Sequence, residues 1–363
     1  MVEVTAAPAD IVAAMLDQMG SLLPHVAQII APIEAARDRI RGYYGDRITV
    51  LPELGAPFTP VTAIDGANIT DRLVVGDRVA TLAVAVRTDP TGAAAVLRHH
   101  AWHDLHPHTP DLDTLARAVM MTDELSLLDA AHEDMALIDG AFPTHLIGIA
   151  AGLASTDETT REVVIERVNG DGVLGAIPLL ARPNVVACPK SDSSMALWDG
   201  CAQDLDLVGR GLPDKALASL ILHPGEVITL PSAALPWQAF HATIAKVSDP
   251  RARAVAHTLA AAAVPVIGDG TAQVMLTVPR GGTFAVKVEM PAATDAFTAA
   301  DNLATIVAHI PAPHLQEPLP QYLADTVAKS LSAAAAAHMQ QLRLDVANHD
   351  LTHLPYLTGY RTL

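Results

Sequence analysis

The order in which short apolar runs follow one another constrains the fold of this chain more than any other feature. The first strong runs, residues 60–66 and 72–86, are rich in β-branched residues and separated by turn signals, which predicts two or three adjacent antiparallel strands. Later runs, such as 134–140 and 184–188, alternate with longer helical patterns. Strands that come first and then alternate with helices predict an α/β fold, a mixed sheet flanked by helices.

The segment before the first strand is predicted to be a helical arm. Apolar residues recur at helical spacing over residues 8–43, and Pro24 and Pro32 are the expected breaks. We therefore predict an N-terminal helical arm over residues 1–55 and a single domain with helical insertions over residues 56–363. Core packing or dimer contact is the expected role of the arm.

The remaining elements follow from periodicity and turn residues. A β-hairpin is expected over residues 274–290, where Pro-Arg-Gly-Gly forms the turn. Helices are expected over residues 112–131, 159–177, 251–264, 299–310 and 320–346.

Small aliphatic side chains must build the core. Hydrophobic residues make up 50% of the 363 residues, whereas aromatic residues make up only 4%. Ala, Val, Leu and Ile therefore have to fill the interior. Such a core favours helices packed on a sheet.

Charge and cysteine content restrict partners and compartment. The formal net charge of -17 argues against a broad basic surface for nucleic acid, so any DNA contact is expected to be local. Cys188 and Cys201 form neither a disulfide framework nor a CxxC metal motif, which fits a reducing cytoplasm. Apolar stretches are interrupted well before the roughly 18 residues that a membrane helix needs. We expect a cytoplasmic protein without a membrane segment.

Two of the predicted strands end in an Asp-Gly pair. These pairs are Asp65-Gly66 and Asp139-Gly140, and Glu124 lies on the predicted helix between them. Carboxylates at neighbouring strand ends can converge, and a following Gly allows close approach of backbone and substrate. Mg²⁺ and Mn²⁺ prefer such oxygen ligands, so Asp65, Glu124 and Asp139 are the predicted metal ligands. By itself, Asp-Gly after a strand is an ordinary turn.

The order of these and later motifs resembles the NurA nuclease family. Its members carry an Asp-Gly at the end of an early strand, then a helical Glu, then a second strand ending in Asp-Gly, as Asp65, Glu124 and Asp139 do here. Lys190-Ser191 is similar to the family's Lys-Ser or Lys-Thr element after a strand. Asp325 matches a late motif in which a Pro-containing turn opens a helix, although the family's Gly-Tyr-Pro opening is lost here.

A further part of the resemblance lies in residues 284–291. They are similar to a hairpin strand of the family in which a basic residue and Glu alternate before Pro. Spacing by two places Lys287 and Glu289 on one face of a sheet. A salt-bridging role on an exposed face is favoured over catalysis at this point.

The resemblance covers residues 60–330 and implies an RNase H-like fold and a DNA nuclease dependent on Mn²⁺ or Mg²⁺. It implies endonuclease and 5′-to-3′ exonuclease activity, a homodimer, and a HerA-type hexameric ATPase as partner, in DNA end processing, repair or defence. In this interpretation Asp65, Glu124 and Asp139 bind metal, Lys190 contacts a substrate phosphate, and Asp325 orients a ligand or water. A translocating partner could supply the grip on DNA that this acidic chain lacks.

Other interpretations stay open at this stage. A catalytically inactive adaptor could keep the fold and dock to an ATPase ring, and an RNase H-like hydrolase could act on RNA with the same metal chemistry. The cluster His99–His108 could bind zinc or manganese, but Pro107 and Pro110 favour an irregular surface loop. Local basic candidates for DNA contact are Arg72, Arg78, Lys190 and Arg210.

Overall fold

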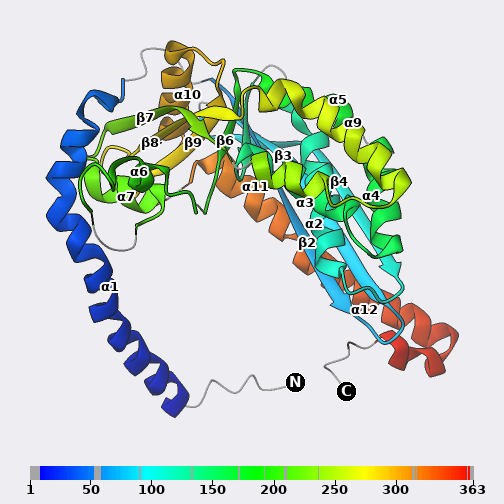
Figure 1. Ribbon diagram of the computed structural model, residues 1–363. Coiled ribbons are helices and arrows are strands. Elements are labelled where there is room, and N and C mark those ends of the chain that lie inside the picture. The colour runs from blue at the N-terminus through cyan, green and yellow to red at the C-terminus, as the bar shows by residue number, and fades with distance from the viewer. Residues whose placement is uncertain are drawn as a thin grey trace.

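The computed structural model describes residues 9–52, 59–89, 91–131, 134–170, 172–191, 193–207, 211–235, 237–312, 315, 317–357 and 359. Within these ranges, nine strands form one mixed sheet in the order β1-β7-β8-β9-β6-β5-β2-β3-β4, and helices cover both of its faces (Figure 1). The predicted α/β fold, a mixed sheet flanked by helices, is therefore confirmed. The strands are β1 (Ile48–Val50), β2 (Val61–Arg72), β3 (Asp77–Thr88), β4 (Ala94–His106), β5 (Met135–Asp139), β6 (Val185–Cys188), β7 (Glu226–Ala234), β8 (Thr271–Thr277) and β9 (Val286–Pro291).

One half of the sheet has the strand order β4-β3-β2-β5-β6. In it, β3 is antiparallel to both β2 and β4, as predicted for the first apolar runs, whereas β5 pairs parallel with β2 and with β6. In the other half β7, β8 and β9 are antiparallel, and β8 with β9 is the predicted hairpin.

The Asp65-Gly66 pair does not end its strand, contrary to the prediction. β2 continues to Arg72 because β3 pairs with it along its whole length. The parallel pairing with β5, however, stops at Ile64 opposite Ile138. The aspartates that follow, Asp65 and Asp139, therefore lie where two parallel strands separate.

The histidine-rich segment was also wrongly predicted. Residues 94–106 form β4, an edge strand paired with β3, rather than an irregular loop. Pro107 and Pro110 come after the last strand residue, so neither removes a hydrogen bond from the ladder. Most side chains of β4 are exposed, and this explains how an edge strand can be so rich in polar residues.

The N-terminal helix α1 (Ala9–Tyr43) is continuous, so Pro24 and Pro32 are not breaks. Both prolines are exposed, where water can satisfy the carbonyl groups that lose a backbone donor. The last turns of α1 pack against α6 (Ala196–Cys201), α7 (Asp214–Ile221) and β8, with Ile33 and Ile40 buried. Residues 1–8 and 53–55 of the expected arm lie outside the described residues, and the division at residue 55 stays a prediction.

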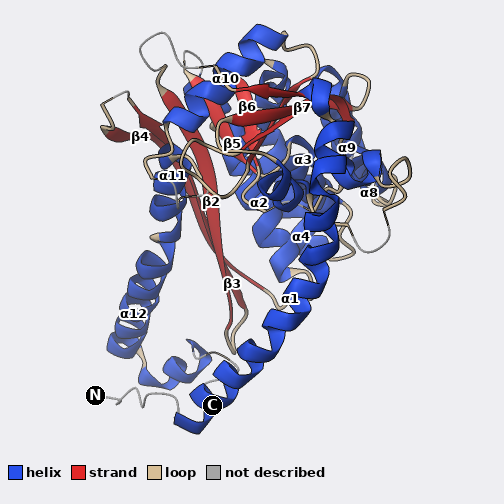
Figure 2. Cartoon of the chain, turned by 90° about the vertical axis from the view of Figure 1, so that its left-hand side faces the viewer, coloured by secondary structure: helices blue, strands red, loops and turns tan. Residues whose placement is uncertain are grey.

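The remaining helices cover the two faces of the sheet, as Figure 2 shows for α2 and α11 on opposite sides of β2. The segment predicted as one final helix is divided at Ser330 into two helices. The helices that cover the sheet are α2 (Leu112–Ser126), α3 (Phe142–Leu153), α4 (Glu158–Gly170), α5 (Val173–Ala176), α8 (Trp237–Ile244), α9 (Pro250–Ile267), α10 (Ala296–Ala308), α11 (Leu319–Lys329) and α12 (Leu331–His349). Among the described residues, none of the helices combines the length and the apolar character that a membrane span requires.

Alternation along the strands divides the core between the two faces. Ile64 and Ile138 belong to the apolar cluster under α2 and α3, whereas Ala63 and Leu137 belong to the cluster under α10 and α11. Successive strand residues point to opposite faces. The residue after Ile138, Asp139, therefore points toward α11, and Asp65 does so as well.

Candidate active site

The centre of the candidate site is Lys190, which directly follows β6 and Pro189. Its ammonium Nζ lies 2.6 Å from Asp65 Oδ2 and 3.5 Å from Asp139 Oδ2. The loop that carries it is held by Lys215, whose Nζ donates to the carbonyl groups of Pro189 at 3.2 Å and Lys190 at 3.0 Å. The structure thus brings three of the predicted site residues, from β2, β5 and the β6 loop, into direct contact.

Helix α11 and the residues before it close the site from the other side. Asp325 Oδ1 lies 3.1 Å and Glu317 Oε2 lies 3.8 Å from Lys190 Nζ. Asp325 stands in the second turn of α11 rather than in its first, and its other oxygen pairs with Lys329 at 2.7 Å. Four carboxylates therefore surround the single ammonium group of Lys190.

Gln321 of α11 fixes the orientation of Asp139. Its buried side-chain Nε2 donates to Asp139 Oδ1 at 3.0 Å and to Cys188 O at 2.9 Å. The backbone N–H of Gly140 also donates to Asp139 Oδ1, at 2.8 Å. With Oδ1 held by two donors, Oδ2 is the oxygen of Asp139 that faces Lys190.

Glu124 of α2 reaches the site from the opposite side of β2. A Cβ atom on Gly66 would clash with Glu124 Oε1, so only a residue without a side chain permits this approach. The second oxygen, Oε2, lies 2.5 Å from Nε2 of His145 on α3. Glu124 and His145 are both buried, with 5% and 2% of their surface exposed. Glu124 therefore belongs to the site but is held apart from Lys190.

The electrostatics of the site are dominated by negative charge. Burial raises the pKa of Asp65 to about 7; Lys190 opposes this increase, and Glu124 and Asp139 add to it. Burial by itself lowers the pKa of Lys190, but Asp65, Asp139 and Asp325 together outweigh burial and the net pKa is raised. Lys190 therefore stays protonated in the cluster, whereas Asp65 loses its proton at a higher pH than an ordinary carboxyl group does.

The donor set suits a hard divalent cation, although no ready-made metal site is present in the described part of the chain. There, no three His, Cys, Asp or Glu side chains are arranged as a group that could hold an ion. The oxygens of Asp65, Glu124 and Asp139 nevertheless are the ligand type that Mg²⁺ and Mn²⁺ prefer. The raised pKa of Asp65 and the close approach of Glu124 over Gly66 both indicate a place where positive charge would be stabilised.

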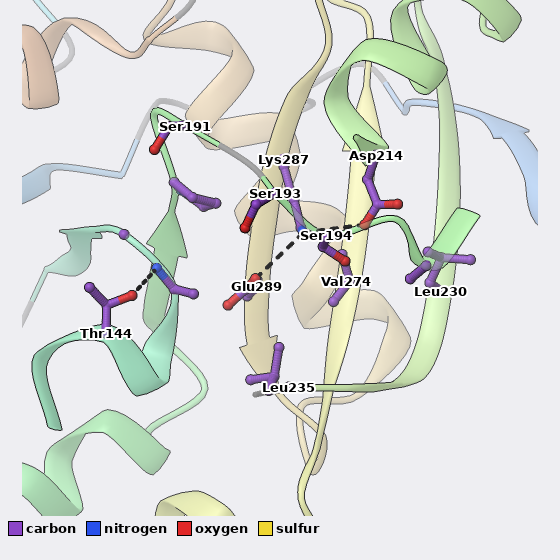
Figure 3. Close-up of a pocket in the computed structure, with 14 residues that line it drawn as sticks. Thr144, Ser191, Ser193, Ser194, Asp214, Leu230, Leu235, Val274, Lys287 and Glu289 are labelled. Atoms are coloured by element: carbon purple, nitrogen blue, oxygen red, sulfur yellow. Dashed lines mark hydrogen bonds and ion pairs between the residues drawn. The ribbon is translucent and has the colours of Figure 1, made fainter. Parts of the chain in front are cut away.

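A cavity of about 290 Å³ lies beside the cluster (Figure 3). Its lining includes Gly140, Pro189 and Ser191, the chain neighbours of Asp139 and Lys190. Figure 3 shows Lys287 on β9 between Asp214 on one side and Glu289 on the other. Lys287 Nζ lies 3.4 Å from Asp214 Oδ2 and 3.8 Å from Glu289 Oε1. Both strand residues are buried, so the expectation of an exposed salt-bridging face was wrong. They line this cavity because β9 is an inner strand of the sheet.

Other candidates lie away from the cluster. His108 Nδ1 is 2.9 Å from Asp77 Oδ1, and the described histidines of residues 99–108 take part in no metal-ligating group. Arg72 and Arg78 line a separate cavity, and Arg210 lies outside the described residues.

Sequence reasoning missed His145, Glu317 and Gln321. His145 carried a signal, because it is the only ionisable residue in the otherwise apolar or neutral helix α3. Gln321 lies inside the motif that pointed to Asp325. Glu317 lies just before α11 and had no distinguishing pattern around it.

Comparison with solved structures shows that the overall fold is shared with known proteins. The crystal structure of the NurA nuclease from Sulfolobus solfataricus matches with a TM-score of 0.60 and 13% identity, over 90% of this chain and 97% of that chain. A crystal structure of NurA matches with a TM-score of 0.53 and 12% identity, over 93% of this chain and 99% of that chain. A crystal structure of NurA with manganese matches with a TM-score of 0.52 and 13% identity, over 90% of this chain and 98% of that chain. No protein-family model and no curated protein matches the sequence. The expected NurA fold is confirmed, and the chain shares it over about nine tenths of its length.

Proposed function

We propose that the chain is a metal-dependent DNA nuclease of the NurA type. The observation that carries the proposal is the meeting of Asp65 and Asp139 where β2 and β5 separate, with Glu124 reaching the same place over Gly66. Carboxylates from two parallel strands and an adjacent helix, within a fold shared with NurA structures, support phosphodiester hydrolysis.

Each residue has a distinct part in this proposal. Asp65, Glu124 and Asp139 would hold Mn²⁺ or Mg²⁺, which when bound activates water and stabilises the leaving oxygen. Lys190 keeps the carboxylates together and presents its ammonium group to a substrate phosphate. Asp325 holds Lys190 from the side of α11, so it acts by positioning that lysine.

A cavity of about 490 Å³ between the β2–β3 hairpin and α12 is the proposed contact for a more distant phosphate. Arg72, Arg78 and Arg343 line it together with Asp71, so it is locally basic in a chain of net charge -17. Arg72 lies seven residues beyond Asp65 on β2, or about 23 Å at the usual rise of a strand. A DNA backbone that runs along β2 would pass both places.

The finer activity and the partner also belong to the proposal. We infer endonuclease and 5′-to-3′ exonuclease activity, a homodimer, and work in DNA end processing or defence beside a HerA-type hexameric ATPase. The net charge supports a translocating partner, because such a ring would supply the electrostatic grip that this chain provides only locally.

The test is cleavage of linear single- and double-stranded DNA by the full chain with Mn²⁺, Mg²⁺ or EDTA. Wild type should cut only with metal, and Asp65→Ala and Asp139→Ala should lose cutting while their circular dichroism is unchanged. Asp129→Ala is a matched control, since Asp129 is an exposed acid that pairs with Arg98. Retained cutting by Asp65→Ala would contradict the assignment.

Two other outcomes would redirect the proposal. Absence of cutting in every metal, together with binding to an ATPase ring, would favour an inactive adaptor; the net charge of -17 agrees with this alternative, because an adaptor needs no grip on DNA of its own. Cutting of RNA in preference to DNA would keep the metal chemistry and change the substrate.

A further inference from the structure

The two oxygens of Glu124 lie in different surroundings. Oε2 lies 2.5 Å from His145 Nε2, and a carboxylate can only accept from that ring nitrogen, so Nε2–H is the donor. Oε1 instead lies beside the backbone of Gly66, the residue after Asp65. One oxygen is therefore committed to a hydrogen bond, and the other faces the strand that carries Asp65.

Within the described part of the chain, the bond to Glu124 is the one hydrogen bond that the His145 ring makes. Its ring is buried on α3, and its Nδ1 has no hydrogen-bond partner among the described residues. An unsatisfied buried nitrogen is unfavourable, and an apolar residue would avoid that cost in a helix as apolar as α3. The contact with Glu124 is the feature that distinguishes this histidine from a core side chain.

We propose that His145 is a positioning residue that binds Oε2 of Glu124 and thereby leaves Oε1 as the oxygen that serves as a metal ligand. This inference rests on the proposed metal-dependent function, and it adds a residue outside the ligand set. Partners that orient a ligating side chain in this way affect metal affinity by about 10- to 100-fold when they are removed. Gly66 is also needed for this arrangement, because Oε1 of Glu124 occupies the space that a side chain at position 66 would fill.

The experiment is titration of the metal-free full chain with Mn²⁺ in the absence of DNA, followed by electron paramagnetic resonance of free Mn²⁺. We expect His145→Ala to bind Mn²⁺ about 10- to 100-fold more weakly than wild type. His145→Gln should recover part of this loss, because its amide can also donate to Glu124. The matched control is His106→Ala, which removes a histidine that is also buried but lies on β4.

Gly66→Ala is a second variant that leaves His145 in place. Its Cβ atom would displace Oε1, and we expect weaker Mn²⁺ binding here also. In DNA cleavage, His145→Ala should need more Mn²⁺ for half-maximal rate but approach the wild-type rate at saturating Mn²⁺. A residue that only fills the core would not produce this separation.

The outcomes separate this inference from the proposed function. If wild type binds Mn²⁺ and cuts DNA while His145→Ala and His145→Gln bind Mn²⁺ with unchanged affinity, the positioning role is wrong and the nuclease proposal stands. If wild type neither binds Mn²⁺ nor cuts DNA, both proposals fall. Should His145→Ala not fold, equal Mn²⁺ affinity of His145→Gln, Gly66→Ala and wild type would overturn the inference.

Discussion

Lys190 Nζ lies 2.6 Å from Asp65 Oδ2, and this contact joins the loop after β6 to the middle of β2. Within 4 Å of the same ammonium group are the carboxylates of Asp139, Glu317 and Asp325. One cation is thus shared among four acids that come from three separate parts of the fold. Such a cluster stabilises poorly by itself, because burial and mutual repulsion act against the charged carboxylates.

We predict that Asp65→Asn makes the metal-free protein more stable above pH 7 while it abolishes cleavage. Burial raises the folded-state pKa of Asp65 from 3.8 to about 7, so the unfolded chain loses this proton first as pH rises. The wild-type free energy of unfolding should therefore fall between about pH 4 and 7, a fall that Asn does not share. At about 1.4 kcal/mol per pKa unit, the difference should reach roughly 2–4 kcal/mol at pH 8.

Urea unfolding of both proteins in EDTA at pH 5, 6, 7 and 8 measures this difference. It should grow with pH and level off above pH 7. A difference that is independent of pH would mean that Asp65 ionises normally in the folded protein.

Lys190→Met should have the opposite effect on stability. Without the ammonium group, the four carboxylates lose their common partner, and we expect the free energy of unfolding at pH 8 to fall by roughly 2 kcal/mol. Added Mn²⁺ should then raise the melting temperature more than it does in wild type, because a bound cation replaces the missing charge. Differential scanning calorimetry with and without Mn²⁺ measures both effects. Lys329→Met is the matched control, since Lys329 pairs with Asp325 but is 72% exposed.

The sequence predicted Asp65, Asp139 and Asp325 as acids of the site, but neither Glu317 nor the way these acids meet. Asp139 was placed correctly at the end of β5, because a short apolar run followed by Asp-Gly is a local signal. Asp65 was wrongly placed at a strand end, because the extent of β2 depends on pairing with β3 rather than on its own residues. Local patterns therefore identify which residues are candidates, and pairing decides where they lie.

The contacts that unite the site are long-range and had no local pattern. Lys190 and Asp65 are 125 positions apart in the chain, and Gln321 and Asp139 are 182 apart. The burial of Lys287 was missed for a related reason, since alternating charges are typical of an exposed strand and nothing local shows that β9 is internal. These features follow from the order of strands in the sheet, which spacing along one sequence does not determine.

The basic cavity beside α12 should contribute to DNA binding at a distance from the carboxylates. In the double variant Arg72→Gln, Arg343→Gln, binding of a labelled duplex in EDTA should weaken, and the slope of log K against log salt should decrease in size by about 2. Fluorescence anisotropy at salt concentrations from about 50 to 200 mM measures the slope, because phosphate contacts weaken strongly over this range. Arg251→Gln removes an exposed arginine on α9 and serves as control. An unchanged slope in the double variant would exclude DNA contact at this cavity.

The last turns of α1 should be held to the sheet in a pH-dependent way by Arg41 and Glu226. Arg41 Nη1 and Nη2 lie 2.7 Å and 3.0 Å from the two oxygens of Glu226, and the hydrogen bonds from Arg41 lower the pKa of that carboxyl from 4.5 to about 2. A depressed folded-state pKa means that the stabilisation is complete above pH 4.5 and is lost as pH falls toward 2. Glu226→Gln should therefore destabilise the protein by about 1 kcal/mol at pH 7, a modest value because the pair is partly solvated. Urea unfolding at pH 7, 4.5 and 3 should show the gap between the two proteins narrowing below pH 4.5, whereas a constant gap down to pH 3 would mean that the substitution disturbs packing rather than the ion pair.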